Sequence, residues 1–154
     1  MSNESMSLMP PSVLLVDDEA SFLETLAKRI AKRDLKVAKA YSGQEALDTL
    51  KGGGGATTFD VIILDVKMPG MDGLETLAAI KHKHPNLEVI MLTGLATVES
   101  AIDGMKAGAY DYLMKPCDID LLMAKIDRAV LKKREHEEKI LEAKAQMIAL
   151  RRGD

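Results

Sequence analysis

Short runs of apolar residues alternate with segments of helical periodicity five times along this chain. The apolar runs have strand length, and the clearest of them reads Val-Ile-Ile-Leu at residues 61–64. Runs that are apolar at every position are typical of strands buried on both faces of a parallel sheet. We therefore predict an α/β fold built from βαβ units, with strands at residues 13–16, 36–40, 61–64, 88–92 and 110–114.

Each predicted strand is followed by apolar residues that recur at helical spacing. Ser42 is a candidate N-cap for the second helix, and the glycines at 52–55 end it. No Lys-Ser or Lys-Thr follows these glycines, so we interpret them as a loop and not as a phosphate-binding P-loop. The helices are identified by Phe22, Leu23, Leu26 and Ile30; by Ala46, Leu47 and Leu50; by Leu74, Leu77 and Ile80; by Val98, Ile102 and Met105; and by Ile119, Leu122 and Ile126.

The last helix is predicted to run from Ile119 to about Leu150. Its 3-4 spaced positions are 119, 122, 126, 129, 133, 136, 140, 143, 147 and 150, and all but two of them are apolar. The part beyond about 131 would project from the domain, so we predict that it pairs with a second copy. The residues expected in this contact are Ile126, Ile140, Met147 and Leu150, and the polar exceptions are Lys133 and His136. The alternative is a solvated tail beyond Lys132.

The composition of the chain disfavours several classes of protein. Hydrophobic residues make up 47% and charged residues 29%, with a formal charge of −3 and no basic stripe, which disfavours nucleic-acid binding by this chain alone. Cys117 is the one cysteine, as expected in a reducing cytosol. No segment resembles a signal peptide or a membrane span. We expect a cytoplasmic protein with a loose tail at 1–11, a domain at 12–131 and, at 132–154, a helical extension or linker that is a candidate coiled coil.

Polar residues follow four of the predicted strands. Asp17 and Asp18 follow the first, Asp65 the third, Thr93 the fourth and Lys115 the fifth. Ligands of doubly wound sheets bind beyond the carboxyl ends of the strands, so these side chains should gather at one edge. Three neighbouring carboxylates repel one another unless a cation neutralises them. An all-oxygen set with room for water suits Mg²⁺.

At these positions the sequence resembles the response-regulator receiver family. The matching stretches are Val-Asp-Asp-Glu at 16–19, Leu-Asp-Val-Lys-Met-Pro-Gly-Met-Asp-Gly at 64–73, Leu-Thr-Gly at 92–94 and Tyr-Leu-Met-Lys-Pro at 112–116. The resemblance covers roughly Ser12 to Leu131. It implies a doubly wound (βα)5 fold with a five-stranded parallel sheet in the flavodoxin-like order 2-1-3-4-5, and a signalling module that supports its own phosphorylation and autodephosphorylation.

The resemblance also implies a role for each site residue. Asp65 would accept a phosphoryl group from a sensor histidine kinase or a histidine phosphotransfer protein. Asp18 and Asp65 would bind Mg²⁺ directly, Asp17 through a water molecule, and Lys67 through its backbone carbonyl. Lys115, preceding a cis proline, would supply positive charge to the phosphoryl oxygens. Thr93 would be the switch hydroxyl, and Tyr112 the aromatic residue that follows its movement.

Simpler interpretations exist for each residue. Asp17 or Asp18 could cap a helix, Thr93 could be a turn residue, Lys115 could be a solvated strand end, and Tyr112 could be an ordinary half-buried tyrosine. Their joint occurrence at the strand ends favours the functional interpretation.

Two other classes of protein compete with the receiver. A phosphatase of the haloacid dehalogenase type would need an acid where Lys67 stands, and a receiver that works without phosphorylation would not need the intact set. Two positions depart from the family pattern, because Cys117 replaces an aromatic residue and Leu95 is apolar. The sequences of residues 65–69 and 108–112 most resemble those of receivers that precede an AAA+ transcription activator.

Overall fold

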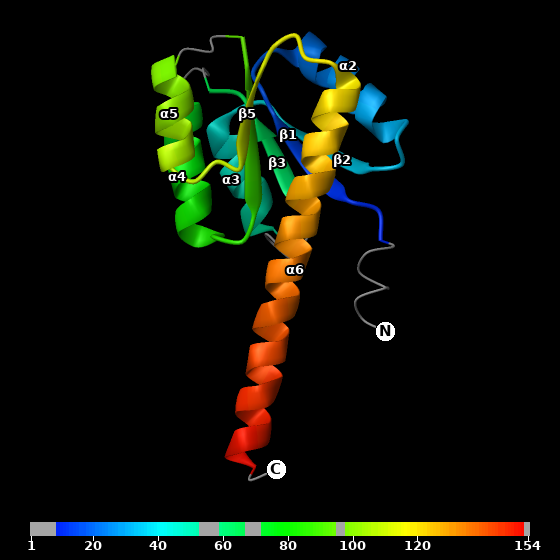
Figure 1. Cartoon of the computed structure of the whole chain (residues 1–154). Helices are drawn as coiled ribbons and strands as arrows, with labels where there is room; N and C mark the ends of the chain where they lie inside the picture. Colours follow the sequence, from blue (N-terminus) through cyan, green and yellow to red (C-terminus); the bar gives the residue numbers. More distant parts are fainter. Residues whose placement is uncertain (1–8, 53–58, 67–71, 95–97, 153–154) are drawn as a thin grey trace.

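The structure is a computed structural model, and it describes residues 9–52, 59–66, 72–94 and 98–152. In this part of the chain, five parallel strands alternate with helices (Figure 1). The strand order β2-β1-β3-β4-β5 confirms the predicted doubly wound fold. The elements are β1 (Ser12–Val16), α2 (Ala20–Ala31), β2 (Lys36–Ala40), α3 (Gly43–Lys51), β3 (Val61–Leu64), α4 (Gly73–Lys83), β4 (Glu88–Thr93), α5 (Val98–Lys106), β5 (Asp111–Met114) and α6 (Ile119–Arg151).

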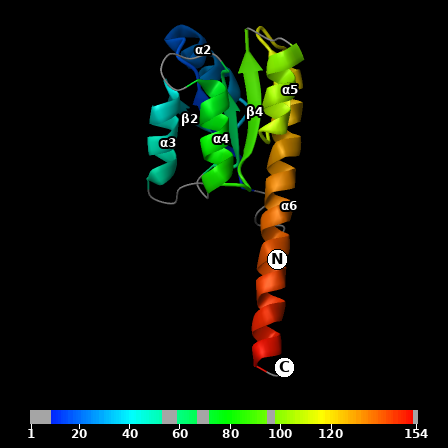
Figure 2. The same ribbon diagram turned by 90° about the vertical axis from the view of Figure 1, so that its left-hand side faces the viewer.

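The sheet is covered on both faces, which explains why residues 13–16 of β1 and all of β3 are apolar. Val13 and Leu15 of β1 belong to the core layer under α2 and α6, whereas Leu14 and Val16 belong to the layer under α3 and α4. Figures 1 and 2 show the two groups of helices on opposite sides of the sheet. Because successive side chains of a strand point to opposite faces, both sets must be apolar.

Three of the described helices, α3, α4 and α6, have a side chain that caps the N-terminus. The Ser42 hydroxyl accepts a hydrogen bond from the Glu45 amide, which confirms the predicted cap of α3. Asp72 caps α4 and Asp118 caps α6 in the same way. The C-cap of α3 is Gly52, as expected, and the other three glycines of that run lie outside the described residues.

The fourth predicted helix, α5, presents its large apolar residues to solvent. Val98, Ile102 and Met105 are 77%, 47% and 48% exposed. The helix instead meets the sheet through Gly104, where a Cβ atom would lie only 2.3 Å from the sulfur of Met91. The close approach at Gly104 leaves the apolar residues that identified the helix on its outer side.

Helix α6 is 33 residues long and extends well beyond the sheet, so its predicted length is confirmed (Figures 1 and 2). The prediction that Ile126 belongs to a contact with a second copy is wrong, because Ile126 is fully buried against the sheet of its own domain. Lys133 is also buried, and its ammonium group lies 2.8 Å from Glu137 and 3.9 Å from Asp60. Both residues therefore face the domain.

The described helices do not have the character of membrane spans. None of them combines the necessary length and apolarity, and α6 in particular carries charged residues along its length. The expected loose tail at 1–11 lies mostly outside the described residues.

Candidate functional site

The predicted site residues meet at the carboxyl edge of the sheet. Backbone hydrogen bonds continue past the strand ends: the Asp17 amide donates to Ala40 at 3.1 Å, and the Asp65 amide to Val16 at 3.0 Å. The Lys115 amide donates to the Thr93 carbonyl at 2.8 Å. Because Asp17, Asp65 and Lys115 are tied to neighbouring strands in this way, the sheet itself fixes where their side chains begin.

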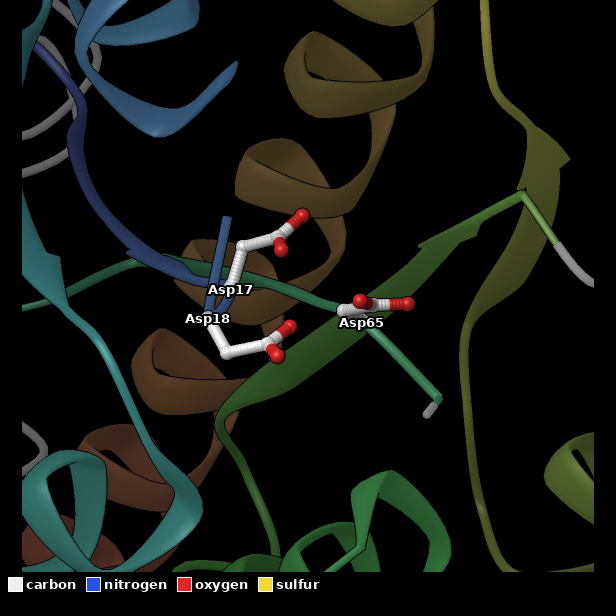
Figure 3. A group of neighbouring side chains, drawn as sticks. All are labelled: Asp17, Asp18 and Asp65. Carbon is white, nitrogen blue, oxygen red and sulfur yellow. The ribbon is translucent and has the colours of Figure 1, made fainter. Parts of the chain in front are cut away.

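Three carboxylates form the centre of the site (Figure 3). Asp17, Asp18 and Asp65 each offer an oxygen within 4.8 Å of the other two. Asp17 and Asp65 are buried, whereas Asp18 is exposed. Burial raises the pKa of Asp17, and the charge of Asp65 raises it further, although hydrogen bonds from Lys115 and the Glu19 amide act against this. An all-oxygen cluster with one ligand open to water fits a hard cation such as Mg²⁺.

Lys115 supplies positive charge beside the carboxylates. Its Nζ lies 2.6 Å from Asp17 Oδ2, 3.2 Å from Glu19 Oε1 and 3.7 Å from Asp65 Oδ2. Burial acts to lower the pKa of Lys115, but the bonds and charges of these acids outweigh burial and raise it. The lysine therefore remains cationic. The peptide bond to Pro116 is cis, as the sequence resemblance implied.

The two predicted switch residues lie farther along the same edge. Thr93 is buried at the end of β4. Tyr112 on β5 is half-buried against the α3 and α4 core layer, with its hydroxyl 3.4 Å from Ser100 Oγ. Cys117 is half-buried against the other layer. Lys67 and Leu95 lie outside the described residues.

Gly73 allows the start of α4 to lie directly against the Asp65 segment. Its amide donates to the Val66 carbonyl at 2.7 Å, which places the start of α4 directly against the Asp65 segment. A Cβ atom on Gly73 would lie 2.2 Å from the Asp65 carbonyl oxygen and 2.4 Å from Val66 Cα. Only glycine allows this approach. The spacing of Asp65 and Gly73 carries no signal of such a contact without the fold.

Comparison with known protein families identifies the family to which this site and fold belong. Residues 13–127 match the response regulator receiver domain. The chain belongs to this family. The match excludes the dehalogenase-type phosphatase and agrees with a signalling module that accepts a phosphoryl group from a histidine kinase.

Relatives of this receiver occur among curated proteins and solved structures. It is 39% identical over 124 residues to the DNA-binding transcriptional regulator NtrC of Klebsiella pneumoniae, a match that covers 80% of the chain and 26% of that protein. The chain therefore spans about a quarter of the length of that relative. A receiver domain from Clostridium thermocellum has a TM-score of 0.76 at 33% identity, covering 80% of this chain and 97% of the other. A beryllofluoride-activated DrrB receiver domain has a TM-score of 0.70 at 30% identity. This match covers 79% of this chain and 98% of the DrrB domain.

Proposed function

We propose that Asp65 is the phosphoryl acceptor of this receiver and that a sensor histidine kinase or a histidine phosphotransfer protein is the donor. The observation that carries this assignment is the position of Asp65 at the end of the central strand β3, within reach of Asp17, Asp18 and Lys115. An Asp65 carboxylate oxygen would form a bond to phosphorus as the bond from phosphorus to the histidine nitrogen breaks. The imidazole leaves and takes up a proton.

The residues around Asp65 have separate roles in this proposal. Asp18 and Asp65 would hold Mg²⁺ directly, Asp17 through a water molecule, and Lys67 through its carbonyl. When bound, Mg²⁺ supplies charge that offsets the phosphoryl oxygens. Lys115 is placed to pair with one of those oxygens. Hydrolysis of the acyl phosphate by water would reset the domain.

Thr93 and Tyr112 form the switch in this proposal. The Thr93 hydroxyl would turn toward a phosphoryl oxygen on Asp65, and the Tyr112 ring would fill the space that it leaves. The support is that Thr93 is buried at the site edge and that Tyr112 is half-buried on the neighbouring strand β5. The cytoplasmic location stays a prediction.

The test is labelling with radioactive acetyl phosphate and Mg²⁺. We expect stable label on the wild-type chain, loss of label in Asp65→Asn, and normal labelling in the control Asp48→Asn, which changes an exposed acid on α3. Label on Asp65→Asn at the wild-type rate would show that the acceptor is another residue. An unlabelled wild-type chain would support a receiver that works without phosphorylation.

We further propose that the extension at 132–154, which follows the domain at 12–131, forms a homodimer. With Ile126 removed from the predicted contact, the remaining set is Ile140, Met147 and Leu150. Met147 is 55% and Leu150 77% exposed, and Leu141 and Ile148 beside them are 60% and 49% exposed. An amphipathic helix of this kind gains stability when a partner covers its apolar side.

Sedimentation velocity at tens of micromolar tests the dimer. We expect Met147→Lys to shift the chain to a monomer. Ala149→Lys should leave the dimer intact, because two residues along a helix place the new charge about 200° away. A wild-type chain that sediments as a monomer with and without beryllofluoride would contradict the dimer.

A further inference from the structure

The ring of Phe22 lies against the ammonium group of Lys115. Phe22 stands in the first turn of α2, half-buried, and packs on the core layer under α2 and α6. Lys115 Nζ is 4.2 Å from the centroid of the ring. This is well within the range of a cation–π contact, which extends to about 6 Å from the centroid. The lysine side chain is only 11% exposed, so little water competes with the ring.

The ring is a further close neighbour of the ammonium besides its carboxylates. Asp17 at 2.6 Å and Glu19 at 3.2 Å are near enough to accept two of its three N–H donors. Asp65 at 3.7 Å is beyond ordinary hydrogen-bond distance. A lysine has a flexible four-carbon stem, so its charge needs neighbours on several sides to remain in one place. Phe22 supplies the one apolar neighbour of this kind among the described contacts of Lys115.

We propose that Phe22 is a positioning residue for phosphoryl transfer, holding the Lys115 ammonium beside Asp65 through its ring face. The inference rests on the proposed role of Asp65 and Lys115. Phe22 itself touches neither the phosphoryl group nor the metal ligands in this proposal. Its effect on the reaction passes entirely through the lysine.

The aromatic face distinguishes this role from packing. Leucine at 22 keeps an apolar side chain of moderate size but has no ring quadrupole, whereas tyrosine and tryptophan keep the cation–π contact. We expect Phe22→Leu to slow phosphorylation of the full chain by acetyl phosphate and Mg²⁺ by about three- to tenfold, the range of a partly desolvated cation–π contact. Phe22→Tyr should retain the wild-type rate within about twofold.

A double-mutant cycle with Lys115→Met decides between the two roles. If Phe22 acts through Lys115, Phe22→Leu will slow labelling in the wild-type background and add nothing in the Lys115→Met background. Equal slowing in both backgrounds, or no slowing in either, overturns the proposal. Urea unfolding of each variant identifies any loss of rate that follows from loss of folding.

A second measurement uses the wild-type chain and so does not depend on how a variant folds. Protons close to a ring face are shielded, so the Lys115 ε-methylene resonances should lie upfield of those of the other lysines, apart from Lys132, whose Nζ lies 5.4 Å from the centroid of the Tyr110 ring. Ordinary shifts would overturn the contact. The Asp65→Asn labelling experiment separates failure of this inference from failure of the proposed function, because it does not involve Phe22.

Discussion

Burial acts against the charge of both Asp17 and Lys115, whose side chains meet at 2.6 Å. Burial wins for Asp17, so its pKa lies above the ordinary value of 3.8, and the folded domain holds that proton more tightly than the unfolded chain. The acids win for Lys115, so its pKa lies above 10.5. Within this pair, the shift in pKa therefore favours the charged form of Lys115 and disfavours the charged form of Asp17.

The raised pKa of Lys115 predicts a loss of stability at alkaline pH. A group with a raised folded pKa stabilises fully below its unfolded pKa, here 10.5, and loses this contribution as the pH rises through the folded pKa. We expect the wild-type chain to be more stable than Lys115→Met between pH 8 and 10, and the difference to shrink above about pH 10.5. Urea unfolding of both chains across this range measures it. A difference that does not change with pH would contradict the ionic pairing.

Asp18 is predicted to serve Mg²⁺ binding and not folding. It is the exposed member of the carboxylate cluster, so Asp18→Ala should change the free energy of unfolding by less than about 0.5 kcal/mol. The same change should weaken Mg²⁺ binding at least several-fold, as measured by titration calorimetry. Retained Mg²⁺ affinity would mean that the cation, if bound, uses other ligands.

At the level of elements, the approach of α4 to the Asp65 segment depends on Gly73. We predict that Gly73→Ala costs about 2 kcal/mol or more, because its Cβ would clash with backbone atoms that have no room to move. Phosphorylation by acetyl phosphate should slow as well, since Asp65 must shift. The control is Gly52→Ala at the end of α3, where the nearest atom lies at 3.4 Å. Similar urea midpoints for the two variants would contradict the close contact.

Elements were predicted well from the sequence where the spacing of apolar residues matches the faces that the fold buries. Residues 61–64 are apolar at every position because both faces of β3 are covered, so that strand was located to the residue. The same reasoning misplaced Ile126, because a helix that packs on its own sheet and a helix that packs on a partner show the same 3-4 spacing. It also missed Phe22, whose contact with Lys115 joins α2 to the end of β5 and appears only in the folded chain.

At the level of the whole molecule, α6 is held at the end of the sheet opposite the carboxylate site. Three consecutive cations take part, and the two acids that receive them, Asp60 and Glu88, are buried at the starts of β3 and β4. Arg134 Nη2 lies 3.1 Å from Asp60 Oδ2, and Lys132 Nζ 2.9 Å from Glu88 Oε2. Arg134 also donates to the Met9 carbonyl at 3.0 Å. The contacts of α6 with the domain thus continue to Arg134, three residues beyond the predicted boundary at Leu131.

These contacts predict where the chain can be cut. A chain ending at Glu138 keeps Lys132, Lys133 and Arg134 and should unfold at the same urea concentration as the full chain. A chain ending at Leu131 leaves Asp60 without its described cationic partners and Glu88 with only Lys81, at 3.5 Å. Removing one side of a buried ion pair is costly, so we expect a loss of about 3 kcal/mol.

Equal stability of the two shortened chains would show that the ion pairs contribute nothing and that the domain ends at Leu131. Sedimentation of the same chains completes the experiment. Both should be monomers if the apolar residues from Ile140 onward form the dimer, because both lack them. A dimer formed by the chain ending at Glu138 would instead place the contact on the receiver domain itself, where Val98, Ile102 and Met105 of α5 are exposed.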